Sequence, residues 1–239
     1  MNEIDEGVTR WRRVADRIRA AIAEGSMRER LAPETELAER FAVNRHTVRR
    51  AIRFLADEGL LRAERGRGTF VNAQPPRLAY PVGPRTRFSE NVTAEGRTPG
   101  GRLIRAERAS ADAGLAAMLE CPVGAALHRM ETLHVANGVP LSVTTTFFPA
   151  KRFPGIVQAY AETGSITEAL RLEGLPDYRR GETRVSAERI HPADAEHLAS
   201  PPDAIVLVST AIDVDPDRRP IQAKRARFHA DRMELVFRF

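Results

Sequence analysis

The segment that most constrains the fold spans residues 31–71 and reads LAPETELAERFAVNRHTVRRAIRFLADEGLLRAERGRGTFV. Apolar residues recur at helical spacing over 34–41 and again from Arg45 to Gly59, which predicts two amphipathic helices. Only three residues, 42–44, separate them. Helices joined by so short a turn must cross steeply, so the segment predicts a helix-turn-helix. Asn44 and Gly59 support these limits, because Asn caps helix N-termini well and Gly suits the left-handed position after a helix.

The second predicted helix has an apolar face and a basic face. At about 100° per residue, the apolar face is formed by Val48, Ala51, Ile52 and Leu55. The adjoining arc carries Arg45, His46, Arg49, Arg50 and Arg53. A helix that meets only solvent usually mixes charges, whereas residues 40–70 hold eight Arg and three acidic residues. This bias predicts contact with DNA, where Arg can donate two hydrogen bonds to guanine in the major groove.

A short hairpin is predicted after the second helix. Residues 60–62 and 69–71 flank the sequence Glu64-Arg65-Gly66-Arg67-Gly68, whose glycines allow positive φ and close approach to a partner. No parallel-type strand precedes this turn and no helix follows it, so it is not a dinucleotide-binding fingerprint. We interpret the hairpin as the wing of a winged helix, with Arg65 and Arg67 at its tip facing phosphates or the minor groove.

The segment 31–71 resembles, over its whole length, the DNA-binding domain of the GntR family of bacterial transcriptional regulators. The resemblance implies that Arg45, Thr47 and Arg49 read bases and that Gly66 approaches DNA at the wing. Thr35 stands where many relatives carry a further DNA-contacting Arg. The predicted partner is a double-stranded DNA operator, and the predicted DNA-binding residues are Arg45, His46, Thr47, Arg49, Arg50, Arg53, Arg65, Gly66 and Arg67.

The length of 239 residues is enough for two domains, each with its own core. Residues 9–24 predict a first helix whose apolar stripe, including Trp11, completes a three-helix core, and Gly25 is expected to end it. Residues 72–84, NAQPPRLAYPVGP, contain four prolines and no periodicity. We therefore predict a DNA-binding domain over 1–72, a semi-rigid linker over 73–84 and a second domain over 85–239.

The second domain contains an internal repeat with an offset of about 80 residues. Residues 127–152 match 207–232, and each copy carries a hairpin-turn signal, Asn137-Gly138 in the first and Asp215-Pro216-Asp217 in the second. The two copies predict one mainly antiparallel sheet with helices against it, so the expected fold class of the chain is α+β. Such a domain could serve as a dimerisation platform or could hold a ligand.

Residues 85–239 resemble the UTRA effector domain of the HutC subfamily, which has a chorismate-lyase-like fold. The stretches TRFSENVTAEGRTPGGRL and RFHADRMELV are similar to those of phosphonate-metabolism regulators of the PhnF type. The resemblance implies dimerisation and binding of a small, often phosphorylated or carboxylated, metabolite. The effector site that it implies comprises Phe88, Ser89, Arg129, Ser165 and Arg184. Glu131 stands where sugar-phosphate-binding relatives have a second Arg, and Thr144 and Gln222 stand where a carboxylate is common.

Composition argues against a disulfide-bonded, metal-binding, membrane or secreted protein. The single cysteine, Cys121, permits neither an intrachain disulfide nor a cysteine-based metal cluster. No stretch approaches the roughly 18 apolar residues of a membrane span, and no signal-peptide pattern is present, so we expect a soluble cytoplasmic protein. His191, Asp194, His197 and Asp203 are not expected to bind metal, because His191-Pro192-Ala193-Asp194 is typical of a helix start. No metal and no cofactor are predicted.

The favoured hypothesis is a homodimeric repressor that binds a palindromic operator and is released by a small anionic effector bearing a phosphate, phosphonate or carboxylate. The alternative is a small-molecule enzyme on the same chorismate-lyase-like fold, since a fold does not fix a function. The sequence contains no G-x-S-x-G, H-E-x-x-H or P-loop motif. We therefore predict no catalytic residues and do not expect an enzyme.

Overall fold

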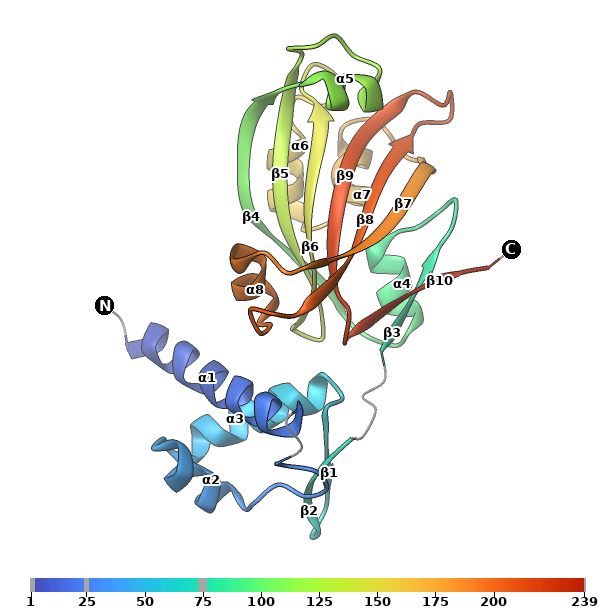
Figure 1. Cartoon of the computed structure of the whole chain (residues 1–239). Helices are drawn as coiled ribbons and strands as arrows, with labels where there is room; N and C mark the ends of the chain where they lie inside the picture. The colour runs from blue at the N-terminus through green and yellow to red at the C-terminus, as the bar shows by residue number, and fades with distance from the viewer. Residues whose placement is uncertain (1–2, 24–25, 73–76, 239) are drawn as a thin grey trace. The chain divides into compact units, whose positions relative to one another are not determined.

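The computed structural model describes residues 3–23, 26–72 and 77–238, and the chain divides near Arg77 into two compact units. Helices and strands are both abundant, so the predicted α+β class is confirmed. The N-terminal unit is built from α1 (Glu3–Ala23), α2 (Glu34–Phe41), α3 (Arg45–Asp57), β1 (Leu61–Glu64) and β2 (Gly68–Val71), as Figure 1 shows. The strands β1 and β2 form the predicted antiparallel hairpin.

The turn between α2 and α3 forms for local reasons. The side-chain oxygen of Asn44 accepts a hydrogen bond from the backbone N–H of Thr47 at 2.8 Å, so the predicted N-cap is confirmed. Ala42 takes the left-handed conformation at φ 52°, which ends α2 abruptly. Gly59 takes φ 76° after α3, the conformation that glycine adopts without steric cost. The expected end of the first helix at Gly25 lies outside the described residues.

A three-helix core holds this unit together. Ile18, Leu37 and Leu55, from α1, α2 and α3, are completely buried in one hydrophobic cluster. Trp11 is buried and meets the ring of Phe54 edge-on at 5.0 Å, so its predicted place in the core is confirmed. Because each helix contributes a complete apolar stripe, the unit has the means to fold by itself.

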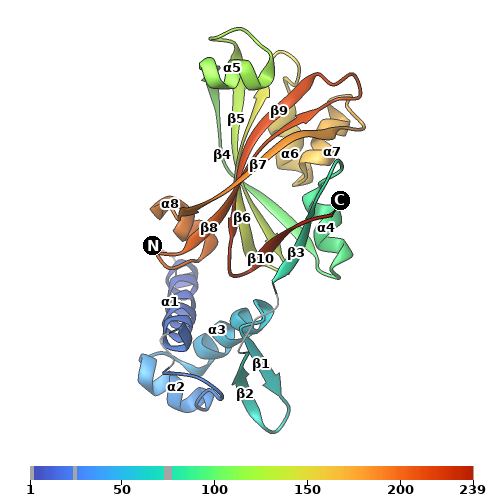
Figure 2. The same cartoon turned by 45° about the vertical axis from the view of Figure 1, so that its right-hand side comes forward.

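The C-terminal unit is organised by a six-stranded antiparallel sheet in the order β4-β5-β6-β9-β8-β7. Its strands are β4 (Pro99–Ser110), β5 (Ala126–Ala136), β6 (Val139–Pro149), β7 (Arg179–Arg189), β8 (Ile205–Val214) and β9 (Pro220–His229). Each half of the sheet is one copy of the internal repeat, strand, helix, strand, strand, and the two copies meet at the β6–β9 pair (Figure 2). The predicted sheet and repeat are therefore both present.

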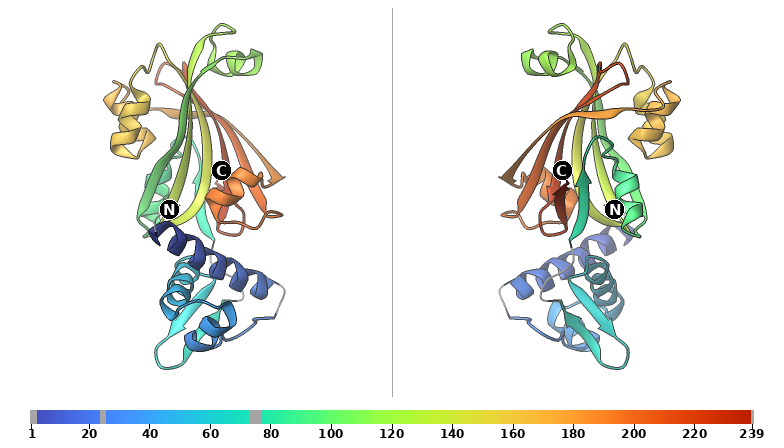
Figure 3. Two further views of the ribbon diagram at one scale, coloured as in Figure 1. Left: turned by 90° about the vertical axis from the view of Figure 1, so that its left-hand side faces the viewer. Right: turned by 90° about the vertical axis from the view of Figure 1, so that its right-hand side faces the viewer.

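Helices cover both faces of this sheet, as Figure 3 shows. One face carries α4 (Phe88–Ala94), α6 (Ile156–Thr163) and α7 (Ile166–Leu172), and the other carries α5 (Ala113–Leu119) and α8 (Pro192–Leu198). Successive side chains of a strand point to opposite faces. On β5, Met130 therefore packs with α6 and α7, whereas Leu133 packs with α8.

The second unit begins earlier than the sequence predicts. Residues 78–82 were expected in a linker because of their prolines, but they form β3 (Leu78–Val82), which pairs in parallel with β10 (Met233–Phe237). Pro81 is tolerated because this is a two-stranded sheet, where a strand has one free edge. Leu78 and Tyr80 are buried in a core with Phe228. Burial of these side chains outweighs the composition of the segment.

The separate cores lead to a stability prediction. We expect Leu37→Ala to lower the free energy of unfolding of the N-terminal unit by about 2–5 kcal/mol, the usual effect of a cavity in a packed core. The transition of the C-terminal unit should not move. Leu141→Ala, at an equally buried position of β6, should have the reverse effect. Differential scanning calorimetry of the full chain checks both, and a single transition lowered by either change would contradict independent cores.

Candidate functional site

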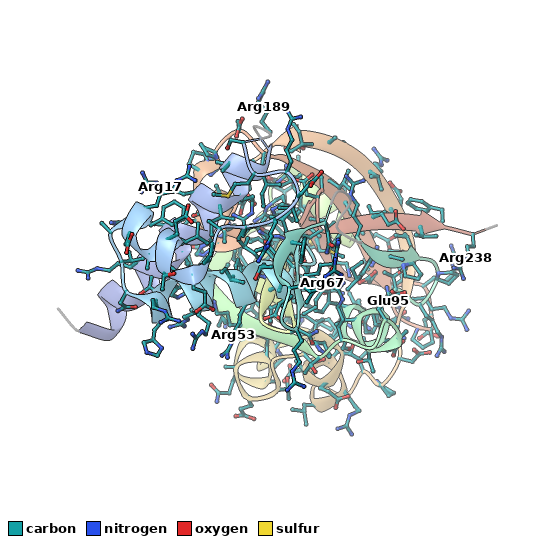
Figure 4. The ribbon with its side chains drawn as sticks, turned by 90° about the horizontal axis from the view of Figure 1, so that it is seen from below. Arg17, Arg53, Arg67, Glu95, Arg189 and Arg238 are labelled. Carbon is teal, nitrogen blue, oxygen red and sulfur yellow. The ribbon has the colours of Figure 1, made fainter. Side chains whose placement is uncertain are left out.

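The recognition helix α3 exposes the basic face that the sequence predicts. Arg45, His46, Arg50 and Arg53 are exposed, and Thr47 and Arg49 are half-buried. The hydroxyl of Thr47 donates to the Asn44 side chain at 2.8 Å, which fixes it at the first turn of the helix. Figure 4 shows the side chains of Arg53, on α3, and Arg67, on the hairpin.

Arg49 is held by an acidic side chain from α2. Its Nε and Nη2 donate to the carboxylate of Glu34 at 3.0 and 2.7 Å. The hydrogen bond from Arg49 lowers the pKa of Glu34, with Arg45 and Arg53 adding to the effect. Since a planar guanidinium fork matched to a carboxylate has few free rotations, Arg49 is held in one orientation at the start of the recognition surface.

The wing has the predicted tip. Arg65, Gly66 and Arg67 are all exposed, and Gly66 has φ 75° with open space around the position of a Cβ atom. Arg67 pairs with Glu64 at 2.5 Å and lies over the ring of Phe70 at 5.7 Å. The flat ring and the neighbouring carboxylate orient the guanidinium without burying it.

Arg50 has a second contact within the unit. Its guanidinium lies 4.9 Å from the centre of the Trp11 ring on α1. This stacking places Arg50 beside the joint between α1 and α3.

A cavity of about 490 Å³ lies within the C-terminal unit. It is bounded by the sheet face that carries α4, α6 and α7, and by β3 and β10. The predicted effector residues Phe88, Ser89 and Ser165 line it. The ring of Phe88 lies 4.7 Å from that of His134, and Ser165 caps α7 by accepting from the backbone of Glu168.

Two predicted effector residues do not reach this cavity. Arg129 lies on β5 beside Phe147 and pairs with Glu107 at 2.9 Å, on the sheet face opposite the cavity. Arg184 lies on the edge strand β7, opposite Thr210, and its side chain is 81% exposed beside Glu182. Neither side chain lines the cavity, because alternation along a strand sends both of them away from it.

Three basic residues that the sequence analysis did not select line the cavity instead. They are Arg87, Arg180 and Lys224. Arg87 directly precedes the predicted pair Phe88-Ser89, so its position was a usable signal. Lys224 stands two residues from Gln222 on β9 and hence on the same face of the sheet. Arg180 precedes a register shift in β7, which sequence spacing alone does not show.

Asp213 joins the polar groups at one end of the cavity. Its carboxylate accepts from Arg180 Nε at 2.6 Å, from Lys224 Nζ at 2.7 Å and from the side-chain amide of Gln222. Burial alone would raise the pKa of Asp213, but Lys224 and Arg180 outweigh it and hold that pKa below its ordinary value. The carboxylate is therefore ionised, and it accepts hydrogen bonds from three side chains.

The cavity retains an excess of positive charge. Arg180 and Lys224 share the one carboxylate of Asp213, and Arg85 and Arg87 share that of Asp177. None of the residues that line the cavity is acidic. Burial, together with the nearby Lys224, lowers the pKa of His134 to about 4, so this ring is neutral at neutral pH. Arg87 also lies 3.8 Å from the carboxylate of Glu90, so these four cations and three carboxylates leave about one positive charge for a ligand to balance.

The described residues contain neither a metal-binding cluster nor a membrane-spanning helix. No group of three or more His, Cys, Asp or Glu side chains in this part of the chain has the arrangement of a metal site. Over the same residues, no helix has the length and apolar character needed to cross a membrane.

A winged helix-turn-helix with an arginine-rich recognition helix is the architecture of a DNA-binding transcriptional regulator. Residues 11–71 match the model of the gntR family of bacterial regulatory proteins, and residues 94–234 match that of the UTRA domain. The chain therefore belongs to the GntR family and carries a UTRA domain, and both resemblances seen in its sequence are confirmed.

Individual relatives agree with this assignment. The chain is 39% identical over 231 residues to an uncharacterised HTH-type transcriptional regulator of Rhizobium meliloti (strain 1021), covering 96% of this chain and 94% of the relative. It is 30% identical over 203 residues to the HTH-type transcriptional repressor PhnF of Mycolicibacterium smegmatis, covering 85% and 81%. The crystal structure of PhnF from Mycobacterium smegmatis superposes with a TM-score of 0.63 at 26% identity, covering 95% and 98%.

These relatives are transcriptional regulators, so the alternative of an enzyme on this fold is not supported. The chain is a DNA-binding regulator and not an enzyme.

The Asp213 cluster gives a pH-dependent prediction. Asp213→Asn should lower the free energy of unfolding of the C-terminal unit by about 3–5 kcal/mol at neutral pH, because Arg180 and Lys224 lose their buried counter-charge. The pKa of Asp213 is lower in the folded protein than in the unfolded chain, where it is about 3.9. The ionised carboxylate therefore stabilises the fold fully above the unfolded pKa, and this contribution is lost as the pH falls through the folded pKa. The difference between variant and parent should therefore shrink in acid.

Urea unfolding of both proteins over a pH series measures this difference. Asp177→Asn, at a carboxylate that is 35% exposed, serves as the control with a smaller effect. A pH-independent difference between Asp213→Asn and the parent would contradict the assigned ionisation.

Proposed function

We propose that this protein is a ligand-responsive repressor that leaves a palindromic operator when its UTRA domain binds a small anionic metabolite. The observation that carries the ligand class is the cavity lined by Arg87, Arg180 and Lys224 and by no acidic side chain. Related chains described as repressors, among them NagR of Bacillus subtilis, support the sign of regulation.

The proposed effector site combines charged and neutral donors. Arg87, Arg180 and Lys224 balance the anion, while Ser89 and Ser165 offer hydroxyl groups from two different elements around the same cavity. Phosphate, phosphonate and carboxylate groups each present several acceptor oxygens, which suits converging N–H and O–H donors. A neutral apolar molecule would leave these donors and their charge unbalanced.

The proposed operator is read by the exposed face of α3 and by the wing. One recognition helix contacts too few base pairs for specificity within a genome, so we propose a homodimer that reads two half-sites of an inverted repeat. Footprinting should show two related half-sites. The proposed site of action is the cytoplasm, where the operator is accessible.

The proposed response to ligand requires that effector binding and operator binding are thermodynamically coupled. An effector changes operator affinity only if it binds the DNA-competent and DNA-incompetent states differently, and the operator must then change effector affinity by the same factor. An effector that binds tightly without changing operator affinity would therefore fail as the regulatory ligand.

The DNA interface is tested by comparing two arginines of α3. Arg45→Ala should cost about 1–3 kcal/mol of operator affinity and blur sequence preference, because Arg45 lies at the first turn of the recognition helix. Arg53→Ala, two turns further on, should weaken all sequences alike and reduce the salt dependence. Fluorescence anisotropy on operator and scrambled DNA at several salt concentrations separates the two. Equal, sequence-independent losses would refute base reading by Arg45.

The effector site is tested with Arg87→Gln. We expect this variant to lose the thermal stabilisation given by small anions, including inorganic phosphate, alkyl phosphonates and carboxylates, and to lose anion-induced release from DNA. Its operator affinity without ligand should stay within about threefold of the parent, because the DNA-binding unit has its own core. Arg184→Gln, which changes an arginine outside the cavity, is the matched control and should respond like the parent.

A further inference from the structure

We propose that Gln222 selects an effector with a hydroxyl group beside its anionic group and discriminates against one with an ammonium group at that place. This inference rests on the proposed effector site and specifies the chemistry of the ligand within it. Gln222 lies on β9, lines the cavity and has 0% exposed surface.

The orientation of the Gln222 amide is determined by its partner. Its nitrogen donates to Asp213 Oδ2, the same carboxylate oxygen that accepts from Lys224 Nζ at 2.7 Å. An ionised carboxylate only accepts hydrogen bonds, so the amide must present its N–H₂ to Asp213 and its oxygen elsewhere. Rotating the amide by half a turn would place two acceptors against each other.

The oxygen of Gln222 is thereby left without a partner. Gln222 Oε1 is buried and has no hydrogen bond to any described residue. A buried acceptor without a donor is costly and uncommon in a folded protein. Because Gln222 lines the cavity, a donor on the bound ligand can satisfy this oxygen.

Arg87, in the cavity wall, has a buried donor that lacks an acceptor. Arg87 Nε is buried without a hydrogen-bond partner, since Glu90 is 3.8 Å away. This N–H can be satisfied only by an acceptor. The cavity therefore presents a free donor on a cation and a free acceptor on a neutral amide, which together fit an anion that also carries a donor group.

The charge around Gln222 decides which donor group fits. A ligand ammonium at Gln222 Oε1 would lie close to Lys224 and Arg180, both of which are already held by Asp213. Asp213 accepts from three side chains and has no capacity to balance another cation. A hydroxyl donates the same hydrogen bond without adding charge, so the amide of Gln222 favours the hydroxyl.

Three matched probes test this inference on the full-length protein: ethylphosphonate, 2-hydroxyethylphosphonate and 2-aminoethylphosphonate. The corresponding three-carbon phosphonates are measured as well, so that each substituent is tried at two distances from the phosphonate. Isothermal titration calorimetry at several pH values, with each affinity corrected for the fraction of the probe that is doubly ionised, gives the affinities. The parent should bind the better hydroxyalkyl probe about tenfold more tightly than the alkyl probe, the effect of one buried hydrogen bond. The aminoalkyl probes should bind more weakly than the hydroxyalkyl probes.

Two variants connect the preference to Gln222. Gln222→Glu should reverse the order of the aminoalkyl and hydroxyalkyl probes, because a carboxylate attracts an ammonium. Gln222→Met, similar in size and without the amide, should bind hydroxyalkyl and alkyl probes alike. Ser209→Ala removes another hydroxyl from the cavity wall and should keep the preference of the parent. A retained cooperative thermal transition of the C-terminal unit shows that each variant is folded.

The outcomes separate this inference from the proposed function. If the parent binds phosphonates without preferring the hydroxyl, or if Gln222→Glu keeps the order of the parent, the role of Gln222 is wrong while the anion site stands. If neither these probes nor inorganic phosphate binds the parent at millimolar concentration, the anion site is wrong and the inference is wrong with it.

Discussion

Along each strand of the six-stranded sheet, successive side chains point to opposite faces, and helices cover both faces. This constraint determines on which face the polar side chains of the six strands lie. The face toward α8 holds a buried charge cluster in which Arg227 pairs with Asp194 at 2.9 Å and with Glu131 at 3.0 Å. The face toward α6 and α7 holds the cavity. A shift of one residue in the pairing of any strand would move the side chains of that strand to the opposite face.

On the cavity face, one carboxylate organises the neighbouring polar groups. Asp213 holds Arg180, Lys224 and Gln222 in fixed positions, so a ligand meets donors and acceptors whose orientation has already been set. Such preorganisation reduces the entropy lost on binding. In the proposed effector site, the same preorganisation allows few residues to select both charge and hydrogen-bonding character.

In the N-terminal unit, the caps, the turns and the position of Arg49 depend on residues that are close in the chain. Asn44 caps the helix that it precedes, Ala42 and Gly59 adopt positive φ beside the helices that they end, and Glu34 holds Arg49 from the adjacent helix. In the proposed DNA complex, Arg49 exchanges the carboxylate of Glu34 for an acceptor on the DNA. An arginine that exchanges one anion for another loses less hydration than a free one, which suits reversible binding.

The sequence by itself determined the helix-turn-helix, the wing, the repeat and the α+β class, because periodicity, caps and turn residues act within a few positions of the chain. It also placed Phe88, Ser89 and Ser165 at the cavity through resemblance. Only the tertiary structure decided that Arg87, Arg180 and Lys224 line the cavity while Arg129 and Arg184 do not. The physical reason is that strand register and pairing, which join residues far apart in the chain, decide the face on which each side chain lies.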